Sequence, residues 1–439
     1  MDEQTEGARP RLPRALKPFQ APQYRLLVAA LLLSLFGSGV WLVTLVWQVI
    51  ELGGGPTELS IAATANAVGM LGSVLVGGAL ADRVPQKYIL LAVELTKAAA
   101  IGTGAVLALT GALELWHVAL MSLVYGITEG FFYPAYSAWL PALLPADQLL
   151  AANGVEGMLR PTILQAAGPA VAGALIAAFS PGIGFLVIAA SQILAAAVLA
   201  AMSRTAVRRQ VAPDGAGPLR SAARDIAEGF RYMLRTRWLL VTLVYACLMI
   251  LVIMGPIEVL LPFAVRDQAG GGAGAFAFVL AAFGIGGALG SILVASLRLP
   301  RRYLTLMNLT WGLGCVPMVV IGFTDRLWLM AAVMFVVGFA FQAGTVIWGT
   351  LLQRRVPAEL LGRVSSLDFF VSLALMPVSM AVAGPIGELV GIPVAFAVAA
   401  TVPALLAVAA VFGFRLRRDE ILHPLDVARP PAQEPVRTP

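Results

Sequence analysis

The sequence predicts an all-α integral membrane protein whose twelve transmembrane helices form two pseudo-twofold-related bundles of six. Of its 439 residues, 59% are apolar and 12% are charged, which is more apolar surface than a water-soluble fold can bury. The apolar residues gather in runs of about twenty or more, each long enough to cross a hydrocarbon core of about 30 Å as a helix. Short strings in the first half of the chain also recur in the second.

Clusters of charged residues, Gly or Pro separate the expected spans. The spans are expected at 25–50, 58–81, 88–110, 117–140, 150–178, 183–203, 238–264, 274–297, 303–323, 328–350, 364–389 and 393–414. They define two six-helix bundles, over 25–203 and 238–414. The rest of the chain is expected to form a tail over 1–24, a linker over 204–237 and a second tail over 415–439.

An internal repeat supports the division into two halves. Leu71–Val76 recurs 218 residues later as Leu289–Val294, and Pro85–Tyr88 recurs 215 residues later as Pro300–Tyr303. Because six spans bring the chain back to the same side, both copies have the same orientation. This is the parallel-repeat plan, whose interface holds a cavity that opens alternately to either side of the membrane.

Arg and Lys concentrate in the tails, the linker and alternate loops, so the positive-inside rule places both termini in the cytoplasm. The N-terminal tail lacks a convincing signal-peptide cleavage site. From Leu219 onward the linker has an amphipathic helical pattern, with Ala222, Ile226, Phe230 and Met233 on one side. Arg far outnumbers Lys, which is typical of GC-rich bacterial genomes and favours a bacterial plasma membrane.

Several function classes are excluded by what the sequence lacks. The lysines Lys17, Lys87 and Lys97 do not follow a glycine, so there is no phosphate-binding loop of the kind that hydrolyses ATP. Cys247 and Cys315 both lie in apolar runs, which argues against a disulfide framework and a metal site. We expect no cofactor, no metal, no nucleic-acid partner and no enzymatic activity. Uphill transport would then draw on an ion gradient.

The loop after the second span resembles the signature of the major facilitator superfamily, which runs G-x-L-a-D-R-x-G-R-R/K. Gly78, Asp82, Arg83 and Lys87 fit this pattern, whereas the two residues before Lys87 depart from it. The resemblance implies the twelve-helix fold of that superfamily. It also implies that Asp82 bonds to a neighbouring helix end and acts as a gate element. The alternative is that these charges only follow the positive-inside rule.

Gly168, Pro169 and Gly173 in the fifth span resemble the antiporter signature of the same superfamily. Gly and Pro in such a string allow close helix contact and a kink. The resemblance favours export over import. Plain helix packing is the alternative, and Gly384–Gly387 in the eleventh span is the repeat partner of the string.

Three longer stretches, Gly126–Pro134, Leu143–Pro145 and Gln353–Arg363, narrow the resemblance to the enterobactin-exporter and Tap-type multidrug branch, over about residues 25–415. This branch implies a monomer that exports small amphiphilic, drug-like compounds in exchange for protons, with Arg363 as a further gate residue. The alternatives are a siderophore or lysophospholipid exporter, a facilitator that needs no proton, and a membrane sensor or scaffold that does not transport.

Five ionisable residues at membrane depth are candidates for proton coupling. Glu129 lies near the middle of the fourth span, where an unpaired charged carboxylate would cost several kcal/mol, and it is the first choice for the proton carrier. Glu156 and Arg160 form an expected i,i+4 pair, and Glu94 and Lys97 an i,i+3 pair. Both pairs could instead be structural braces.

Glu258, near the outer end of the seventh span, and Asp368, near the inner end of the eleventh, could be gate residues or local braces. The resemblance implies that the first, fourth, seventh and tenth spans line the cavity. These spans offer aromatic and amide side chains: Trp41, Trp47, Gln48, Tyr125, Tyr245, Phe341, Gln342 and Trp348. Such a lining suits bulky amphiphiles. An interfacial aromatic belt is the alternative for those near the span ends.

Overall fold

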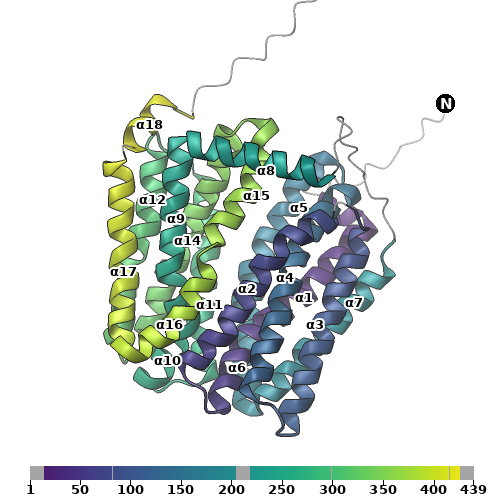
Figure 1. Ribbon diagram of the computed structural model, residues 1–439. Coiled ribbons are helices and arrows are strands. Elements are labelled where there is room, and N and C mark those ends of the chain that lie inside the picture. Colours follow the sequence, from purple (N-terminus) through teal and green to yellow (C-terminus); the bar gives the residue numbers. More distant parts are fainter. Residues whose placement is uncertain (1–13, 82, 204–217, 298, 415, 426–439) are drawn as a thin grey trace, which may run out of the picture.

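The computed structural model describes residues 14–81, 83–203, 218–297, 299–414 and 416–425 (Figure 1). Over these ranges the chain is helical and contains no strand. Twelve helical spans are long and apolar enough to cross a membrane. The predicted fold class is therefore confirmed.

The first half consists of six spans. They are α1 (Pro22–Glu51), α2 (Pro56–Ala81), α3 (Gln86–Leu109), α4 (Leu115–Leu143), a fifth span built from α5 (Ala146–Leu159), η2 (Arg160–Ala167) and α6 (Gly168–Ala178), and α7 (Pro181–Ala201). A short helix, η1 (Arg14–Gln20), precedes them. The expected spans of this half agree with the structure to within a few residues.

The second half repeats this arrangement. The seventh span consists of α9 (Arg237–Gly255), η3 (Pro256–Leu260), α10 (Leu261–Phe263) and η4 (Ala264–Gln268), and the eighth is α11 (Ala273–Ser296). The ninth consists of α12 (Tyr303–Gly314), η5 (Val316–Met318) and α13 (Val319–Phe323), and the tenth is α14 (Leu327–Arg355). The eleventh consists of α15 (Ala358–Leu373) and α16 (Met376–Val390), and the twelfth of α17 (Ile392–Val408) and η6 (Ala409–Gly413). The linker contains α8 (Pro218–Arg235), and the short α18 (Leu416–Leu422) follows the last span.

Proline and glycine set the ends and the irregularities of the spans. Pro22, Pro56 and Pro181 stand in the first turn of their helices, where the missing N–H donor costs nothing. Inside the fifth and seventh spans, Pro161 and Pro256 remove a donor and the helix widens into the π-helical segments η2 and η3. Gln165 of η2 and Glu258 of η3 lie on these widened turns.

The twofold relation appears in the way the halves meet. Leu71–Val76 and Leu289–Val294 both lie in the second helix of their half, α2 and α11. Each of these helices packs against the fifth span of the other half: α2 against α16, and α11 against α6 and η2. In Figure 1 the two halves meet at the end marked by α6 and α10 and diverge toward α8. We name the end that carries α8 the linker end.

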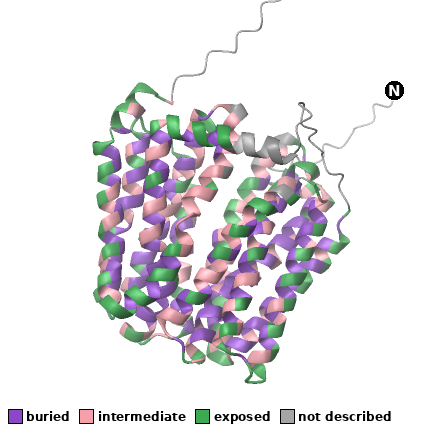
Figure 2. Cartoon of the chain, viewed as in Figure 1, coloured by how far each residue is buried: buried purple, intermediate pink, exposed green. Residues whose placement is uncertain are grey.

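Apolar side chains cover the outside of the bundles. Figure 2 shows exposed residues along the outer faces of the helices and buried residues between them. Many of the exposed ones are large and apolar, such as Val106, Leu120, Ile193 and Leu405. A surface of this kind is stable only in lipid.

The amphipathic helix expected in the linker is α8, which lies across the linker end in Figure 1. Met233 is buried as expected, whereas Phe230 is 47% exposed. The side chains of Ala222 and Ile226 lie outside the described residues. Glu228 of α8 forms an ion pair with Arg363 of α15, with 2.5 Å between Oε2 and Nη1, so the linker is tied to the second half.

Candidate functional site

A charged cluster lies inside the first half, where α1, α3 and α4 meet. The Lys97 side chain is fully buried and forms an ion pair with Glu129 of α4. Its ammonium also lies over the rings of Tyr125 and Phe132, 4.9 and 5.3 Å from their centroids. Cation–π contacts of this kind help to stabilise a cation that has lost its water.

Glu94 belongs to the same cluster but faces α1. It is completely buried, and its Oε1 accepts a hydrogen bond of 2.8 Å from Ser34 Oγ. Its Oε2 has no hydrogen-bond partner among the described residues. The expected ion pair between Glu94 and Lys97 is therefore wrong, because Lys97 reaches across to α4 instead. We call Glu94, Lys97 and Glu129 the buried charge network.

The two carboxylates of this network differ in access to solvent. The Glu129 side chain is 33% exposed. One helical turn further along α4, Tyr133 stacks on Phe369 of α15 in the other half, with ring centroids 6.3 Å apart. Because residues four apart share a helix face, the exposed part of Glu129 faces the space between the halves. Glu94 is closed off from that space.

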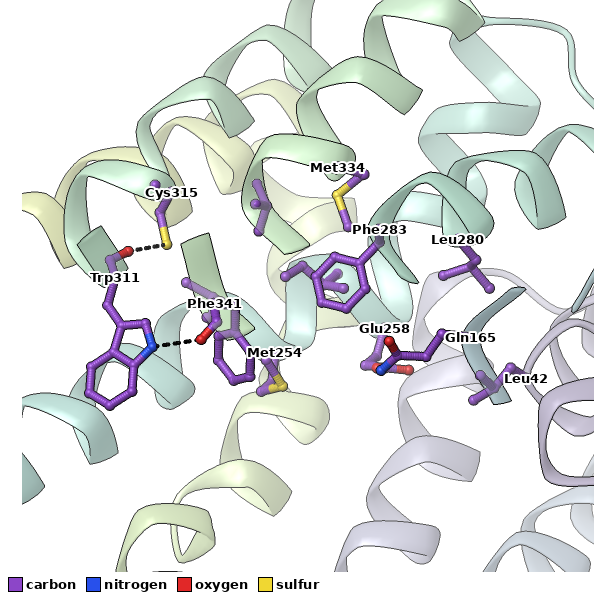
Figure 3. Close-up of a pocket in the computed structure, with 14 residues that line it drawn as sticks. Leu42, Gln165, Met254, Glu258, Leu280, Phe283, Trp311, Cys315, Met334 and Phe341 are labelled. Carbon is purple, nitrogen blue, oxygen red and sulfur yellow. Dashed lines mark hydrogen bonds between the residues drawn. The ribbon is translucent and has the colours of Figure 1, made fainter. Parts of the chain in front are cut away.

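A central cavity of about 90 Å³ lies in the second half, at its boundary with the first (Figure 3). Leu42 and Gln165 come from the first half, and the other lining residues come from the seventh to tenth spans. The lining is almost entirely apolar, with Gln165 and Glu258 as its polar side chains. Phe341 and Glu258, which the sequence indicated for the cavity, are both on its lining. Gln165 was not predicted from the sequence. It could have been indicated by its place as a polar residue between Pro161 and Pro169 in an apolar span.

Other residues that were expected to line the cavity lie instead in contacts between helices. Trp41 and Tyr125 stack on each other, with ring centroids 4.7 Å apart, and Tyr125 donates a hydrogen bond of 2.6 Å to Ser38 Oγ. Gln48 and Tyr245 are buried, at 4% and 3% exposure. Gln342 packs against Gly287 of α11. These side chains help to fix the helices of each half, and a role in binding stays a prediction for them.

Trp47 and Trp348 also make specific contacts. Trp47 stacks on Phe276 of the other half, with centroids 5.6 Å apart. Trp348 Nε1 donates a hydrogen bond of 2.9 Å to Asp368, which also accepts one of 3.2 Å from Ser372. Asp368 is thus held on α15 next to α14, at the linker end of the second half.

A second cleft, of about 480 Å³, lies along the C-terminal part of α4, along α5 and at the start of η2. Its wall carries the expected pair of Glu156 and Arg160, with 3.0 Å between Oε1 and Nε. The Arg160 guanidinium lies over the Tyr133 ring at 5.3 Å. The ion pair therefore adjoins the aromatic contact between Tyr133 and Phe369 that connects the halves.

The glycines of the antiporter-like string lie where helices approach most closely. A Cβ on Gly168 would stand 2.6 Å from Gly39 Cα in α1, and one on Gly173 would stand 2.9 Å from Gly274 Cα in α11. Pro169 is buried between them. The string thus places α6 against both halves, and larger residues would separate the helices.

The repeat partner of this string forms a further contact between the halves. Gly384 N of α16 donates a hydrogen bond of 2.7 Å to Ser60 Oγ of α2. Nearby, Thr57 N donates one of 3.1 Å to Glu388 Oε1. Both contacts lie at the end opposite the linker end.

The expected gate residues after α2 are described only in part. Asp82 lies outside the described residues. Arg83 is exposed, and Gly78 has open space where a Cβ would stand. Lys87 is buried and donates hydrogen bonds to the carbonyls of Ala200, at 2.8 Å, and Met202, at 2.5 Å, at the end of α7. An ammonium there stabilises the negative end of the helix.

In the described ranges, His, Cys, Asp and Glu side chains do not gather into a group that could hold a metal ion. Two six-helix halves related by an internal repeat are the arrangement of the major facilitator superfamily of membrane transporters, and the family match agrees with it. Within this superfamily, the family described as "Transmembrane secretion effector" matches residues 14–437. The chain belongs to that family, and it is a multi-pass bacterial membrane protein without enzymatic activity.

Curated relatives include efflux proteins. The chain is 28% identical over 417 residues to the "Multidrug efflux pump Tap" of Mycolicibacterium fortuitum, covering 92% of this chain and 98% of that protein. It is 24% identical over 365 residues to "Macrolide efflux protein A" of Streptococcus pyogenes, covering 82% and 88% of the two chains.

Solved structures share the fold. The nucleoside transporter NupG superposes with a TM-score of 0.69 at 10% identity, covering 90% of this chain and 99% of its own. A bacterial homologue of the human lysosomal transporter Spinster, solved in an inward-facing conformation, superposes with a TM-score of 0.63 at 16% identity, covering 91% and 98%. At these identities the likeness extends to the fold alone.

Proposed function

We propose that this chain exports small amphiphilic, drug-like compounds across the bacterial plasma membrane in exchange for protons. The observation that carries the proposal is the buried charge network, where two carboxylates share one ammonium inside the first half. Residues that only brace a fold inside a membrane rarely need an ionisable group, because burying one costs several kcal/mol.

The network is electrically neutral only when one of its two carboxylates is protonated. Glu94 and Glu129 carry two negative charges when both are ionised, and Lys97 supplies one positive charge. With Lys97 paired to Glu129, the proton belongs on Glu94, whose Oε2 is buried and unpartnered. With Glu129 protonated, Lys97 would be released to pair with Glu94, one turn away on α3.

This exchange of partners offers a route for coupling. Glu129 is the member that faces the space between the halves, so it is the carboxylate that meets solvent and substrate there. Glu94 binds Ser34 of α1, and α1 in turn packs against η2 and α6, which contact the second half. Moving the proton between Glu94 and Glu129 therefore changes contacts of helices that hold the halves together.

The positive-inside rule places the linker end in the cytoplasm. With this orientation, the contacts of α2 with α16 and of α6 with α11 would close the extracytoplasmic side, and the cleft of about 480 Å³ would lie on the cytoplasmic side. This is the state that would receive a substrate for export. The apolar central cavity and the names of the efflux relatives also support export of amphiphiles.

Inverted membrane vesicles give a direct test. With a proton gradient that is acid inside, the wild-type chain should accumulate a fluorescent amphiphilic dye, and dissipating the gradient should release it. Glu129→Gln and Glu94→Gln should each lower gradient-driven uptake by about tenfold or more, since one exchange partner is lost. Glu51→Gln is the matched control, because Glu51 is an exposed carboxylate at the end of α1.

Uptake that persists after the gradient is dissipated would favour a facilitator. Unchanged gradient-driven uptake in both network variants would remove the buried charge network from the coupling step. Thermal unfolding of each purified variant separates a loss of coupling from a loss of folded protein.

A further inference from the structure

The central cavity contains a carboxylate that the protein itself leaves unpaired. Glu258 lies on η3, is exposed to the cavity, and has no hydrogen-bond or ion-pair partner among the residues that the structure describes. Its surroundings are apolar, and the second polar side chain of the lining is Gln165. In Figure 3 the end groups of Glu258 and Gln165 lie on the same side of the cavity.

Gln165 also presents an unsatisfied group. Its Oε1 is buried and has no hydrogen-bond partner among the described residues. It is fixed in place by close packing, because a Cβ on Gly284 of α11 would stand 2.8 Å from the Gln165 Cβ. Two polar side chains with unsatisfied acceptors, one from each half, therefore lie on the wall of one small apolar space. A ligand that satisfies both must bring donors and a positive charge.

The repeat shows that the fold does not need a carboxylate at this place. Gly39 of α1 packs on the fifth span and Gly255 of α9 packs on the eleventh, so these two glycines correspond. Three residues after each of them stand Leu42 and Glu258, and both line the same cavity. The first half fills its copy of the position with leucine. The charge at Glu258 is therefore an addition of the second half rather than a requirement of packing.

We propose that Glu258 and Gln165 form a binding site for the protonated amine of an amphiphilic cation. The ammonium would pair with the Glu258 carboxylate and donate an N–H to Gln165 Oε1. The cavity of about 90 Å³ has room for the ammonium end of the ligand, and the adjoining part of the apolar chain would contact Phe283, Phe341 and Trp311 on its lining. This site names the chemical class of substrate, and in that respect it rests on the proposed export function.

Equilibrium binding tests the site without any gradient. The full-length protein in lipid nanodiscs is titrated with three dansyl probes on one alkyl chain, ending in a primary ammonium, a trimethylammonium or an acetamide. The wild type should bind the ammonium at least about tenfold more tightly than the acetamide, because a carboxylate in an apolar site favours the cation. Glu258→Gln should make these two affinities equal, while Glu258→Asp and the control Glu51→Gln should keep the preference.

A second variant separates charge from hydrogen bonding. Gln165→Leu should weaken binding of the primary ammonium probe by about threefold to tenfold and leave binding of the trimethylammonium probe unchanged, because only the primary ammonium donates N–H hydrogen bonds. Equal wild-type affinities for ammonium and acetamide, or an unchanged preference in Glu258→Gln, would overturn the proposal. So would loss of acetamide binding in a folded Glu258→Gln, which would make the carboxylate a structural group.

The outcome is distinguishable from that of the export proposal. No gradient is applied, so a failure of proton coupling leaves the three affinities as they are. Equal wild-type affinities for the ammonium and acetamide probes, together with intact gradient-driven uptake, would disprove the amine site and leave the export proposal standing.

Discussion

The two halves share one fold but place their polar groups differently. By the spacing that relates Pro85 to Pro300, Glu94 and Lys97 of α3 correspond to Leu309 and Gly312 of α12. Lys97 occupies its position with a buried ammonium, whereas Gly312 allows α17 to approach closely, with Pro403 O 2.8 Å from where a Cβ would stand. The same span of the repeat is thus built with or without charges at these positions, which supports the proposed role of the first half's charges in coupling.

The cavity shows the opposite asymmetry. There the second half supplies the carboxylate, Glu258, and the first half supplies leucine. The proton-holding groups and the substrate-binding carboxylate are therefore proposed to lie in different halves. The following predictions test that division, from the largest expected effect to the smallest.

Removing the ammonium of the network should have the largest effect. Lys97→Met leaves Glu94 and Glu129 without a cation and should lower the free energy of unfolding by about 3 kcal/mol, a value set at the low end because Glu129 is partly exposed. Gradient-driven uptake should be lost as well. Thermal unfolding of the purified protein measures the first effect.

The double variant Lys97→Met/Glu129→Gln sharpens this prediction. It removes both charges of the pair and should recover most of the stability without recovering uptake. If the double variant is as unstable as Lys97→Met alone, Lys97 contributes through packing rather than through charge.

Enlarging the glycine contacts between the halves should shift the resting conformation. Gly173→Val in α6 and Gly384→Val in α16 should each disfavour the closed end by about 1–3 kcal/mol, since both glycines touch backbone of the other half. Because both contacts lie at the same end, both variants should act in the same direction.

Cys315 on the cavity lining is a natural reporter of this shift. Its labelling by a membrane-impermeant maleimide from the extracytoplasmic side, in a Cys247→Ser background, should be faster in both variants. Gly102→Val is the control, because Gly102 has ordinary spacing to Ala189 within the first half. Opposite effects of the two variants would contradict the twofold arrangement of the gate.

The charged side chains that bind helix ends near the linker end should contribute less to stability. In the first half the charge is positive and binds carbonyls, and in the second half it is negative and binds donors. Lys87 binds carbonyls at the end of α7, whereas the buried Glu420 of α18 accepts hydrogen bonds from Thr305 N, at 2.9 Å, and Thr305 Oγ1, at 2.6 Å, at the start of α12. Lys87→Ala and Glu420→Ala should each cost about 1–2 kcal/mol in thermal unfolding. An effect no larger than that of the exposed Arg417→Ala would show that these contacts do not stabilise the protein.

The smallest effect is expected at the aromatic contact between the halves. Phe369→Leu removes the stacking with Tyr133, which is worth about 0.5–1.5 kcal/mol. Dye efflux should change by less than tenfold while proton dependence is retained. A complete loss of proton dependence would place this contact in the coupling step.

The sequence predicted most of the fold because apolar length and Gly or Pro punctuation are local signals. Partners on other helices were harder to predict. The i,i+3 spacing of Glu94 and Lys97 suggested a pair on one helix, but the spacing contains no information on α4, where Glu129 lies. The hydrogen bonds of Lys87 to the end of α7, more than a hundred residues away, were invisible for the same reason.

Candidate sites were predicted unevenly. Glu129, Glu258 and Phe341 were found because charged or aromatic residues stand out in apolar spans. Gln165 was not, since its exposure to the cavity depends on the widened turn of η2. Trp41 and Tyr125 were expected on the cavity because their spans line it, yet helix rotation turns them into the packed interior, where they stack on each other.

The placement of Glu258 on the cavity lining and of Glu94, Lys97 and Glu129 inside the first half has a consequence for how such a protein diversifies. The proposed amine site at Glu258 shares no side chain with the proposed proton carrier, Glu129. Point substitutions around the cavity should therefore change substrate specificity without abolishing proton coupling. Directed evolution toward a new substrate should accumulate its changes in the seventh to tenth spans and leave α3 unchanged.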